Sequence, residues 1–146
     1  MDSYNIEQIS QFIKSKWAES IVPELQNYIK IPCKSPAFDS NWEANGYLEQ
    51  AIQQFKDWAL NQGVPNMSLD IIRLPGRTPL LFIEIQASTT ANPETILLYG
   101  HMDKQPEMSG WDTDKGPWLP VIIDNKLYGR GGADDGYALF AALTAI

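Results

Sequence analysis

His101, Asp103 and Asp134 have the side-chain types and the spacing of a metal site. His101 is the chain's single histidine, and it follows the apolar run "TILLYG" over residues 95–100. In a strand, residues i and i+2 face the same side, so the side chains of His101 and Asp103 are predicted to point together. A metal-bound imidazole needs an acceptor for its second ring nitrogen, and a carboxylate serves this purpose. The pair therefore combines a candidate ligand with a candidate orienting group.

Asp134 lies in a glycine-rich turn, "YGRGGADDG", at a predicted helix start. The glycines allow close backbone packing, and a carboxylate at this point could bridge two cations. Each signal has an ordinary alternative, since a His-x-Asp pair arises by chance and an aspartate at a helix start is a common cap. Trp111 and Trp118 could pack in the core or in the wall of the site, or could contact a substrate. Arg130 could form a local ion pair or bind a substrate carboxylate.

The elements that must position these residues are predicted from hydrophobic periodicity. Helical spacing runs from Ile6 to Tyr28, with an interruption at Pro23 that is expected to kink the helix or to separate two helices. A second helix presents an apolar face that consists of Leu48, Ala51, Ile52, Phe55, Trp58 and Ala59. An antiparallel strand pair, a strand over 95–103 buried on both faces, a ribbon turning at Asp124-Asn125 and a helix from Asp134 follow. The predicted class is α/β, with helices packed on a mixed, mostly buried sheet.

Composition narrows the class of protein. A chain of 146 residues with 44% apolar and 20% charged residues is the size of one globular domain. The net charge of −7 argues against nucleic acid and anionic membranes as partners. The sequence contains no apolar run long enough to span a membrane and no pattern of a secretory signal. Cys33 is the single cysteine and is expected to be a passive thiol, which together with the absent signal predicts a cytoplasmic location.

Several segments together form a more specific pattern. "IKIPCKSP", "YGHMD", a tryptophan followed by "GPW", and "NKLYGRGGADDG" occur in this order. The pattern resembles the co-catalytic zinc peptidase family that contains carnosinase-like dipeptidases, carboxypeptidases and aminoacylases. The resemblance extends from Leu25 to Ile146, and Cys33 stands at the first serine of the family's Ile-Pro-Ser-x-Ser loop. Gly136-Tyr137 departs from the Lys-Gly of many relatives, which leaves the subfamily and substrate preference open.

The resemblance implies roles for the candidate site residues. His101 matches a ligand of one zinc ion, and Asp103 matches the catalytic-site aspartate that clamps this imidazole without binding metal. Asp134 matches the carboxylate that bridges two zinc ions, and the bond between Asp134 and Asp135 is expected to be cis. Manganese and cobalt are alternative metals. The paired cations would lower the pKa of a shared water molecule and polarise the scissile carbonyl.

The remaining ligands implied by the family are absent from this sequence. They are a Glu-Glu pair that supplies a base and a ligand, a further carboxylate and a second histidine. The closing helix is apolar on nearly every side, as expected inside a larger protein, and its residues Phe140, Leu143 and Ile146 are expected to be exposed here. Residues 1–146 are therefore interpreted as the N-terminal fragment of a metallopeptidase catalytic domain, inactive alone.

The full-length protein is predicted to be a metal-dependent dipeptidase or exopeptidase that hydrolyses small peptides. A homodimer is the oligomeric state considered for it. A deacylase or amidohydrolase on the same scaffold is one alternative, and a non-catalytic truncated remnant is the other. Downstream coding sequence with the Glu-Glu pair and a further histidine would favour the two enzymes over the remnant.

Overall fold

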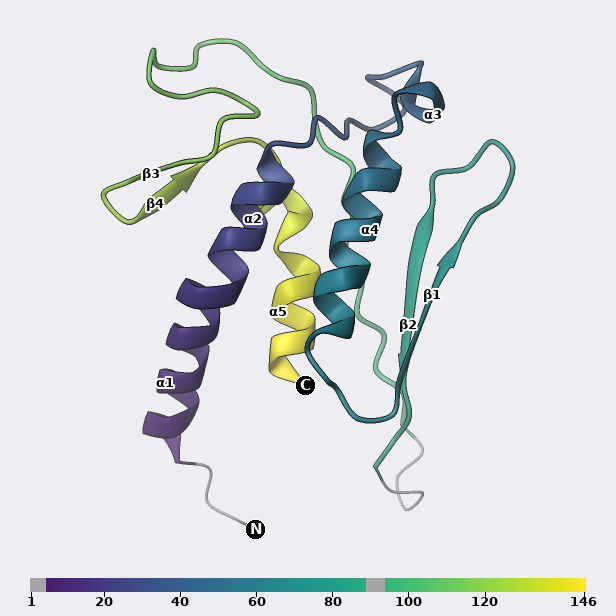
Figure 1. The fold of residues 1–146 in the computed structure, drawn as a ribbon, viewed down its shortest axis with the longest axis vertical. Helices are drawn as coiled ribbons and strands as arrows, with labels where there is room; N and C mark the ends of the chain where they lie inside the picture. Colours follow the sequence, from purple (N-terminus) through teal and green to yellow (C-terminus); the bar gives the residue numbers. More distant parts are fainter. Residues whose placement is uncertain (1–4, 89–93) are drawn as a thin grey trace.

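The computed structural model describes residues 5–88 and 94–146. Helices, two small hairpins and long irregular loops make up this part of the chain (Figure 1). In chain order the elements are α1 (Ile6–Lys16), the π-helical turn η1 (Trp17–Ile21), α2 (Val22–Ile29), α3 (Trp42–Asn45), α4 (Tyr47–Leu60), β1 (Met67–Ile72), β2 (Leu80–Ile85), β3 (Val121–Ile123), β4 (Lys126–Tyr128), the irregular turn η2 (Gly132–Gly136) and α5 (Ala138–Ala145). No helix in the described ranges is long and apolar enough to cross a membrane.

The first three helical elements form one continuous column (Figure 1). The column begins at Asn5, whose side-chain oxygen accepts hydrogen bonds from the backbone N–H groups of Glu7 and Gln8 at 3.0 and 3.3 Å. Pro23 stands in the first turn of α2, directly after the π-helical turn. Proline has no backbone N–H, so residue 23 forms no hydrogen bond back to the preceding turn of the column. The predicted interruption at Pro23 is thus a change of helix type within the column.

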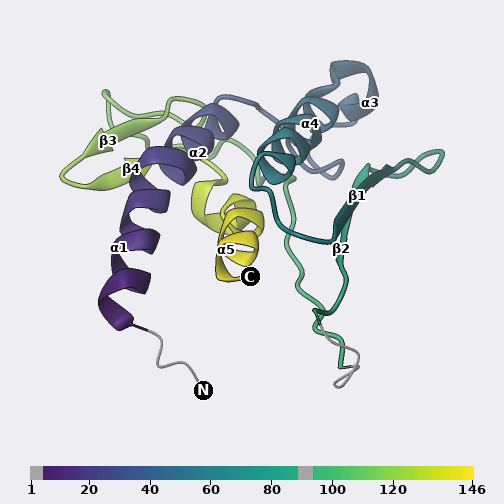
Figure 2. The same cartoon turned by 60° about the horizontal axis from the view of Figure 1, so that its bottom comes forward.

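Helix α4 lies at the centre of the core. All six residues of its predicted apolar face are buried. The helix contacts α2 and α5 as well as both strands of the β1–β2 hairpin, which Figure 2 shows on the side away from α1. Its aromatic side chains join those of the neighbouring helices, with ring centroids 5.0 Å apart for Tyr28 and Phe55 and 4.7 Å apart for Trp58 and Phe140. This aromatic cluster joins α2 and α5 through α4.

Helix α5 contributes more to the core than its sequence indicated. Phe140 is fully buried and Leu143 is nearly so, whereas Ile146 is exposed. The expectation that Phe140 and Leu143 would be exposed is wrong, because α4 covers the face of α5 that carries Phe140. An apolar helix here buries the side that faces its neighbours.

Both hairpins predicted from the sequence are present, and the α/β class is confirmed. β1 and β2 pair antiparallel, with Met67 opposite Ile85 and Ile72 opposite Leu80. The β3–β4 ribbon turns at Asp124 and Asn125, whose φ angles of 49° and 59° are those of a tight left-handed hairpin turn. Both sheets in the described residues are small and antiparallel, where the sequence indicated one mixed sheet.

The strand predicted over residues 95–103 is wrong. This segment belongs to no strand, and the side chains of Ile96, Leu97 and Tyr99 are 84%, 90% and 82% exposed. A strand forms only beside a hydrogen-bonding neighbour, and the described strands pair within their own hairpins. The segment runs past α4 (Figure 1). Directly after it, Lys104 forms a parallel bridge with Lys34 of the loop that follows α2.

Candidate metal site

The three residues singled out from the sequence lie together. Nε2 of His101 is 3.5 Å from Oδ1 of Asp134, and Nδ1 of His101 is 3.4 Å from Oδ1 of Asp103. The side chains of His101 and Asp103 are about one-third exposed, and that of Asp134 is 64% exposed. The imidazole therefore lies between two carboxylates, with each ring nitrogen facing one of them.

The position of the His101 ring defines which nitrogen can bind a metal. Nδ1 is closest to the main-chain oxygen of Asp103, at 3.0 Å, and the Asp103 carboxylate is the second neighbour. Both neighbours are acceptors and lie closer to Nδ1 than Asp134 lies to Nε2, so we assign the proton of the neutral ring to Nδ1. The lone pair of Nε2 is then directed towards Asp134. The sequence predicted the carboxylate of Asp103 as the orienting group, and the structure adds its main-chain carbonyl.

Asp135 connects the turn of Asp134 to the segment of His101. Its Oδ2 accepts a hydrogen bond from the backbone N–H of His101 at 3.3 Å. The peptide bond between Asp134 and Asp135 is cis, as the family resemblance implies. The two segments also meet at Gly100, where an added Cβ would lie 2.6 Å from Cβ of Ala138. A glycine is required here by the close approach of the start of α5.

The loop after α2 supports the site from behind. The carbonyl of Met102 accepts hydrogen bonds from the hydroxyl of Tyr28 at 2.6 Å and from Sγ of Cys33 at 3.4 Å. Burial raises the pKa of the Tyr28 hydroxyl, which therefore remains a donor. The backbone of Lys104 donates to Cys33 at 2.8 Å and accepts from Ser35 at 2.9 Å. Cys33 is fully buried, so its predicted passive role fits a thiol within the support.

Lys104 lies near this site and was not predicted from the sequence. Its side chain is fully buried, and Nζ donates to the main-chain oxygens of Tyr28 at 2.7 Å, Ile29 at 3.3 Å and Ile31 at 2.7 Å. Burial lowers the pKa of Lys104 to about 8, so the ammonium persists at neutral pH. One feature of the sequence pointed to its position. In an extended segment side chains alternate between two faces, so Lys104 lies with Met102 on the face opposite His101.

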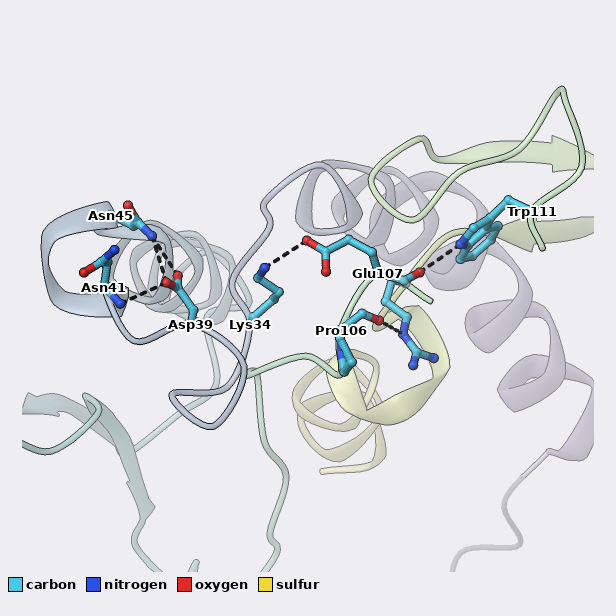
Figure 3. A network of polar contacts seen from close by, with 8 residues as sticks. Lys34, Asp39, Asn41, Asn45, Pro106, Glu107 and Trp111 are labelled. Carbon is cyan, nitrogen blue, oxygen red and sulfur yellow. Dashed lines mark hydrogen bonds and ion pairs between the residues drawn. The ribbon is translucent and has the colours of Figure 1, made fainter. Parts of the chain in front are cut away.

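The segment after Lys104 is fastened by polar contacts (Figure 3). Glu107 pairs with Lys34 at 2.9 Å, and its main-chain oxygen accepts from Nε1 of Trp111 at 2.8 Å. Nε of Arg130 donates to the carbonyl of Pro106 at 3.0 Å. Arg130 thus binds a main-chain carbonyl, whereas the sequence predicted an ion pair or a substrate contact. Trp111 anchors the loop.

Asp39 organises the turn before α3, at the other side of the view in Figure 3. Its carboxylate accepts from the backbone N–H of Asn41 at 3.1 Å and from Nδ2 of Asn45 at 2.8 and 3.0 Å. These bonds close α3 onto the preceding turn.

The donor set fits a divalent metal in part. Imidazole nitrogen and carboxylate oxygen are ligands that zinc prefers, and two such atoms bound to one tetrahedral zinc lie roughly 3.4 Å apart. The separation of 3.5 Å between His101 and Asp134 matches this value. Within residues 5–88 and 94–146, no group of three or more His, Cys, Asp or Glu side chains is placed to hold a metal ion. The described chain therefore offers part of a site.

Comparison with known proteins identifies relatives of this sequence. Residues 97–146, which contain all three candidate residues, match the family described as Peptidase family M20/M25/M40. The predicted resemblance to this peptidase family is confirmed. The Beta-Ala-His dipeptidase of Mus musculus is 35% identical over 94 residues, which are 60% of this chain and 18% of that protein. The Homo sapiens protein of the same name is 36% identical over 70 residues, or 47% of this chain and 13% of that protein.

A third relative, the Beta-Ala-His dipeptidase of Rattus norvegicus, is 39% identical over 54 residues. These residues are 36% of this chain and 11% of the rat protein. The chain thus spans less than a fifth of the length of each of these relatives.

Proposed function

We propose that this chain is the N-terminal part of the catalytic domain of a metal-dependent dipeptidase that hydrolyses small peptides. The observation that carries the proposal is the 3.5 Å approach of Nε2 of His101 to Oδ1 of Asp134. The approach occurs within the segment that matches the peptidase family, and the relatives that share this segment are named as dipeptidases. Zinc is the proposed metal, with manganese and cobalt as alternatives.

Each residue of the chain has a defined task in this proposal. His101 presents the lone pair of Nε2, and Asp103 holds the proton on Nδ1 through its main-chain and side-chain oxygens. Asp134 presents a carboxylate that is 64% exposed and therefore accessible to a metal ion. Divalent metal ions held by His101 and Asp134 would supply a water molecule of lowered pKa and would polarise the scissile carbonyl.

The proposal includes that residues 1–146 are inactive without further residues. A catalytic zinc site uses three protein ligands, and this chain offers His101 and Asp134. Hydrolysis also needs a base to accept the proton of the attacking water. Asp103 faces Nδ1 of the histidine and is not free for this task. We also place the protein in the cytoplasm, where a single buried thiol such as Cys33 is kept reduced.

The decisive test is a substrate panel on the full-length gene product. The panel contains β-Ala-His, other dipeptides and N-acetyl amino acids, each assayed with zinc, manganese or cobalt and with a chelator. We expect dipeptide hydrolysis that the chelator abolishes and that His101→Ala abolishes, whereas Asp70→Asn on the exposed face of β1 leaves it unchanged.

The other outcomes decide between the alternatives. Hydrolysis of N-acetyl amino acids alone would identify a deacylase. A folded, metal-binding protein without activity on any substrate would identify a non-catalytic remnant. Residues 1–146 are assayed in parallel, and turnover by this chain would contradict the proposed incompleteness of its site.

A further inference from the structure

Lys104 connects the two segments that carry the candidate ligands. We propose that Lys104 is a positioning residue that holds His101 opposite Asp134, an inference that rests on the proposed function. The lysine touches neither ligand. It acts through the end of α2 on one side and through the glycine turn before Asp134 on the other.

The first connection is the cap of helix α2. The last carbonyl groups of a helix have no partner within the helix and carry a partial negative charge. Nζ of Lys104 donates to the main-chain oxygens of Tyr28 and Ile29, the last two residues of α2, and to that of Ile31 just beyond the helix. An ammonium has three N–H groups, so its full capacity is directed at the end of α2. Because the lysine is fully buried, water does not compete for these bonds.

The second connection is the hydrocarbon stem of the lysine. A Cβ added to Gly131 would lie 2.7 Å from Cγ, 2.8 Å from Cδ and 2.7 Å from Cε of Lys104. The stem therefore runs directly over Gly131, which immediately precedes the turn η2 that contains Asp134. The ammonium also lies 3.9 Å from the ring centroid of Tyr28 and 5.2 Å from that of Trp118. These rings restrict the side chain to one path.

The backbone of Lys104 adds a third connection. Through Cys33 and Ser35 it forms the parallel bridge that fixes the end of the segment containing His101. Lys104 thus positions both segments relative to the end of α2. Its backbone positions the segment that contains His101, and its hydrocarbon stem positions the turn that contains Asp134. Without the ammonium the stem loses its anchor at α2, and the distance between His101 and Asp134 is no longer defined.

The experiment uses the fact that His101 is the chain's single histidine. Nitrogen-15 NMR of residues 1–146 reports which ring nitrogen carries the proton, and a titration with zinc reports the affinity at the same ring. Lys104→Met removes the ammonium and keeps an unbranched stem. Lys126→Met, at an exposed lysine of β4, is the control. Circular dichroism and thermal unfolding show that each variant is folded.

We expect the proton of the neutral ring to reside on Nδ1 in the unaltered chain and in Lys126→Met. In Lys104→Met both tautomers should appear and the zinc affinity should fall about 10- to 100-fold, the range seen when groups that orient a ligand are lost. A merely structural lysine would lower thermal stability and leave the tautomer and the affinity unchanged. That result in a folded Lys104→Met variant would overturn the proposal.

A second pair of variants keeps every polar group. Gly131→Ala pushes on the stem at a position with φ of 86°, and Gly110→Ala adds the same methyl group at φ of 84° with nothing within 4 Å. The proposal requires that Gly131→Ala disturb the His101 tautomer and that Gly110→Ala leave it intact. Equal spectra, or loss of folding in both Lys104→Met and Gly131→Ala, would assign Lys104 to the fold instead.

The outcome separates this inference from the proposed function. If the unaltered chain shows the Nδ1 tautomer, the effect of Lys104→Met on it is measured without any metal. Failure of zinc to shift the His101 signals in the unaltered chain would count against the metal site itself. A tautomer that responds to Lys104→Met would still establish the positioning role.

Discussion

Nε2 of His101 lies 3.5 Å from Oδ1 of Asp134, although the two residues come from separate segments of the sequence. Neither residue lies in a strand, and Asp134 lies in the turn η2, where its φ of −122° and ψ of 93° are not helical. The approach depends on contacts behind the site, where the loop after α2 holds Met102 and Lys104. The geometry of the site thus depends on the contacts that hold two irregular segments, the one that carries His101 and the one that carries Asp134.

Removal of either candidate ligand should weaken metal binding by residues 1–146. We expect His101→Ala to abolish the zinc-dependent heat in calorimetry and Asp134→Asn to reduce the affinity by at least about 10-fold, because each removes one of two protein ligands. Asp70→Asn, at an exposed carboxylate on β1, is the control for the loss of one negative charge. Affinity that falls equally in all three variants would show that the metal binds to diffuse negative charge.

Replacement of Asp103 should have a smaller effect than replacement of His101. The main-chain oxygen of Asp103 lies 3.0 Å from Nδ1 and survives any substitution, whereas the carboxylate lies 3.4 Å away. We expect Asp103→Asn to lower the zinc affinity about 10-fold, at the lower end of the range for groups that orient ligands. An effect as large as that of His101→Ala would mean that Asp103 binds the metal directly.

Local pattern was sufficient to predict the elements that depend on neighbouring residues. The buried face of α4 follows from the helical spacing of Leu48 to Ala59, and the β3–β4 turn follows from Asp124-Asn125. The prediction of a strand over residues 95–103 failed because an apolar run indicates burial but does not indicate a pairing partner. No described strand pairs with this segment. The spacing of His101 and Asp103 predicted their common direction, which survives outside a strand.

Other features depend on contacts that sequence spacing does not contain. A buried lysine is rare, and the role of Lys104 depends on the end of α2, which the sequence places far away. The burial of Phe140 depends likewise on the position of α4 against α5. The cis bond between Asp134 and Asp135 was accessible through the family resemblance alone.

Gly136 should be the least replaceable glycine of the turn before α5. An added Cβ would contact the ring of Tyr28 and would lie 2.6 Å from the carbonyl oxygen of Gly131. Tyr28 is fully buried and cannot move aside. We expect Gly136→Ala to lower the free energy of unfolding by about 1–3 kcal/mol or more, the range for overpacked cores. Urea unfolding followed by fluorescence measures this change.

Gly116→Ala is the matched control for Gly136→Ala. The nearest atom to its added Cβ would be Cβ of Leu119 at 3.6 Å, which is an ordinary contact. Its free energy of unfolding should stay within about 0.5 kcal/mol of the unaltered chain, as for most surface changes. Similar losses in the two variants would show that the turn does not pack against Tyr28 as described.

Cys33 should react slowly with thiol reagents while the chain is folded. The thiol is fully buried, and burial raises its pKa, although the nearby Lys104 ammonium lowers it in part. Only the thiolate is nucleophilic, so both access and charge oppose the reaction. Because Cys33 is the single cysteine, a chromogenic disulfide reagent reports on it alone. We expect release of the chromophore to accelerate at least about 100-fold in denaturant, when the thiol gains access and an ordinary pKa. Equal rates would contradict its burial.

The same pKa shift predicts how Cys33 affects stability as the pH changes. The folded chain binds the thiol proton more tightly than the unfolded chain, whose cysteine titrates near about 8.5. The contribution of the protonated thiol to stability is therefore complete below this pH and is lost as the pH rises above it. Cys33→Ala removes this dependence. The difference in free energy of unfolding between the unaltered chain and Cys33→Ala should be constant in acid and should decrease in alkali. A difference that grows with pH would mean that the folded chain favours the thiolate, with the Lys104 ammonium outweighing the effect of burial.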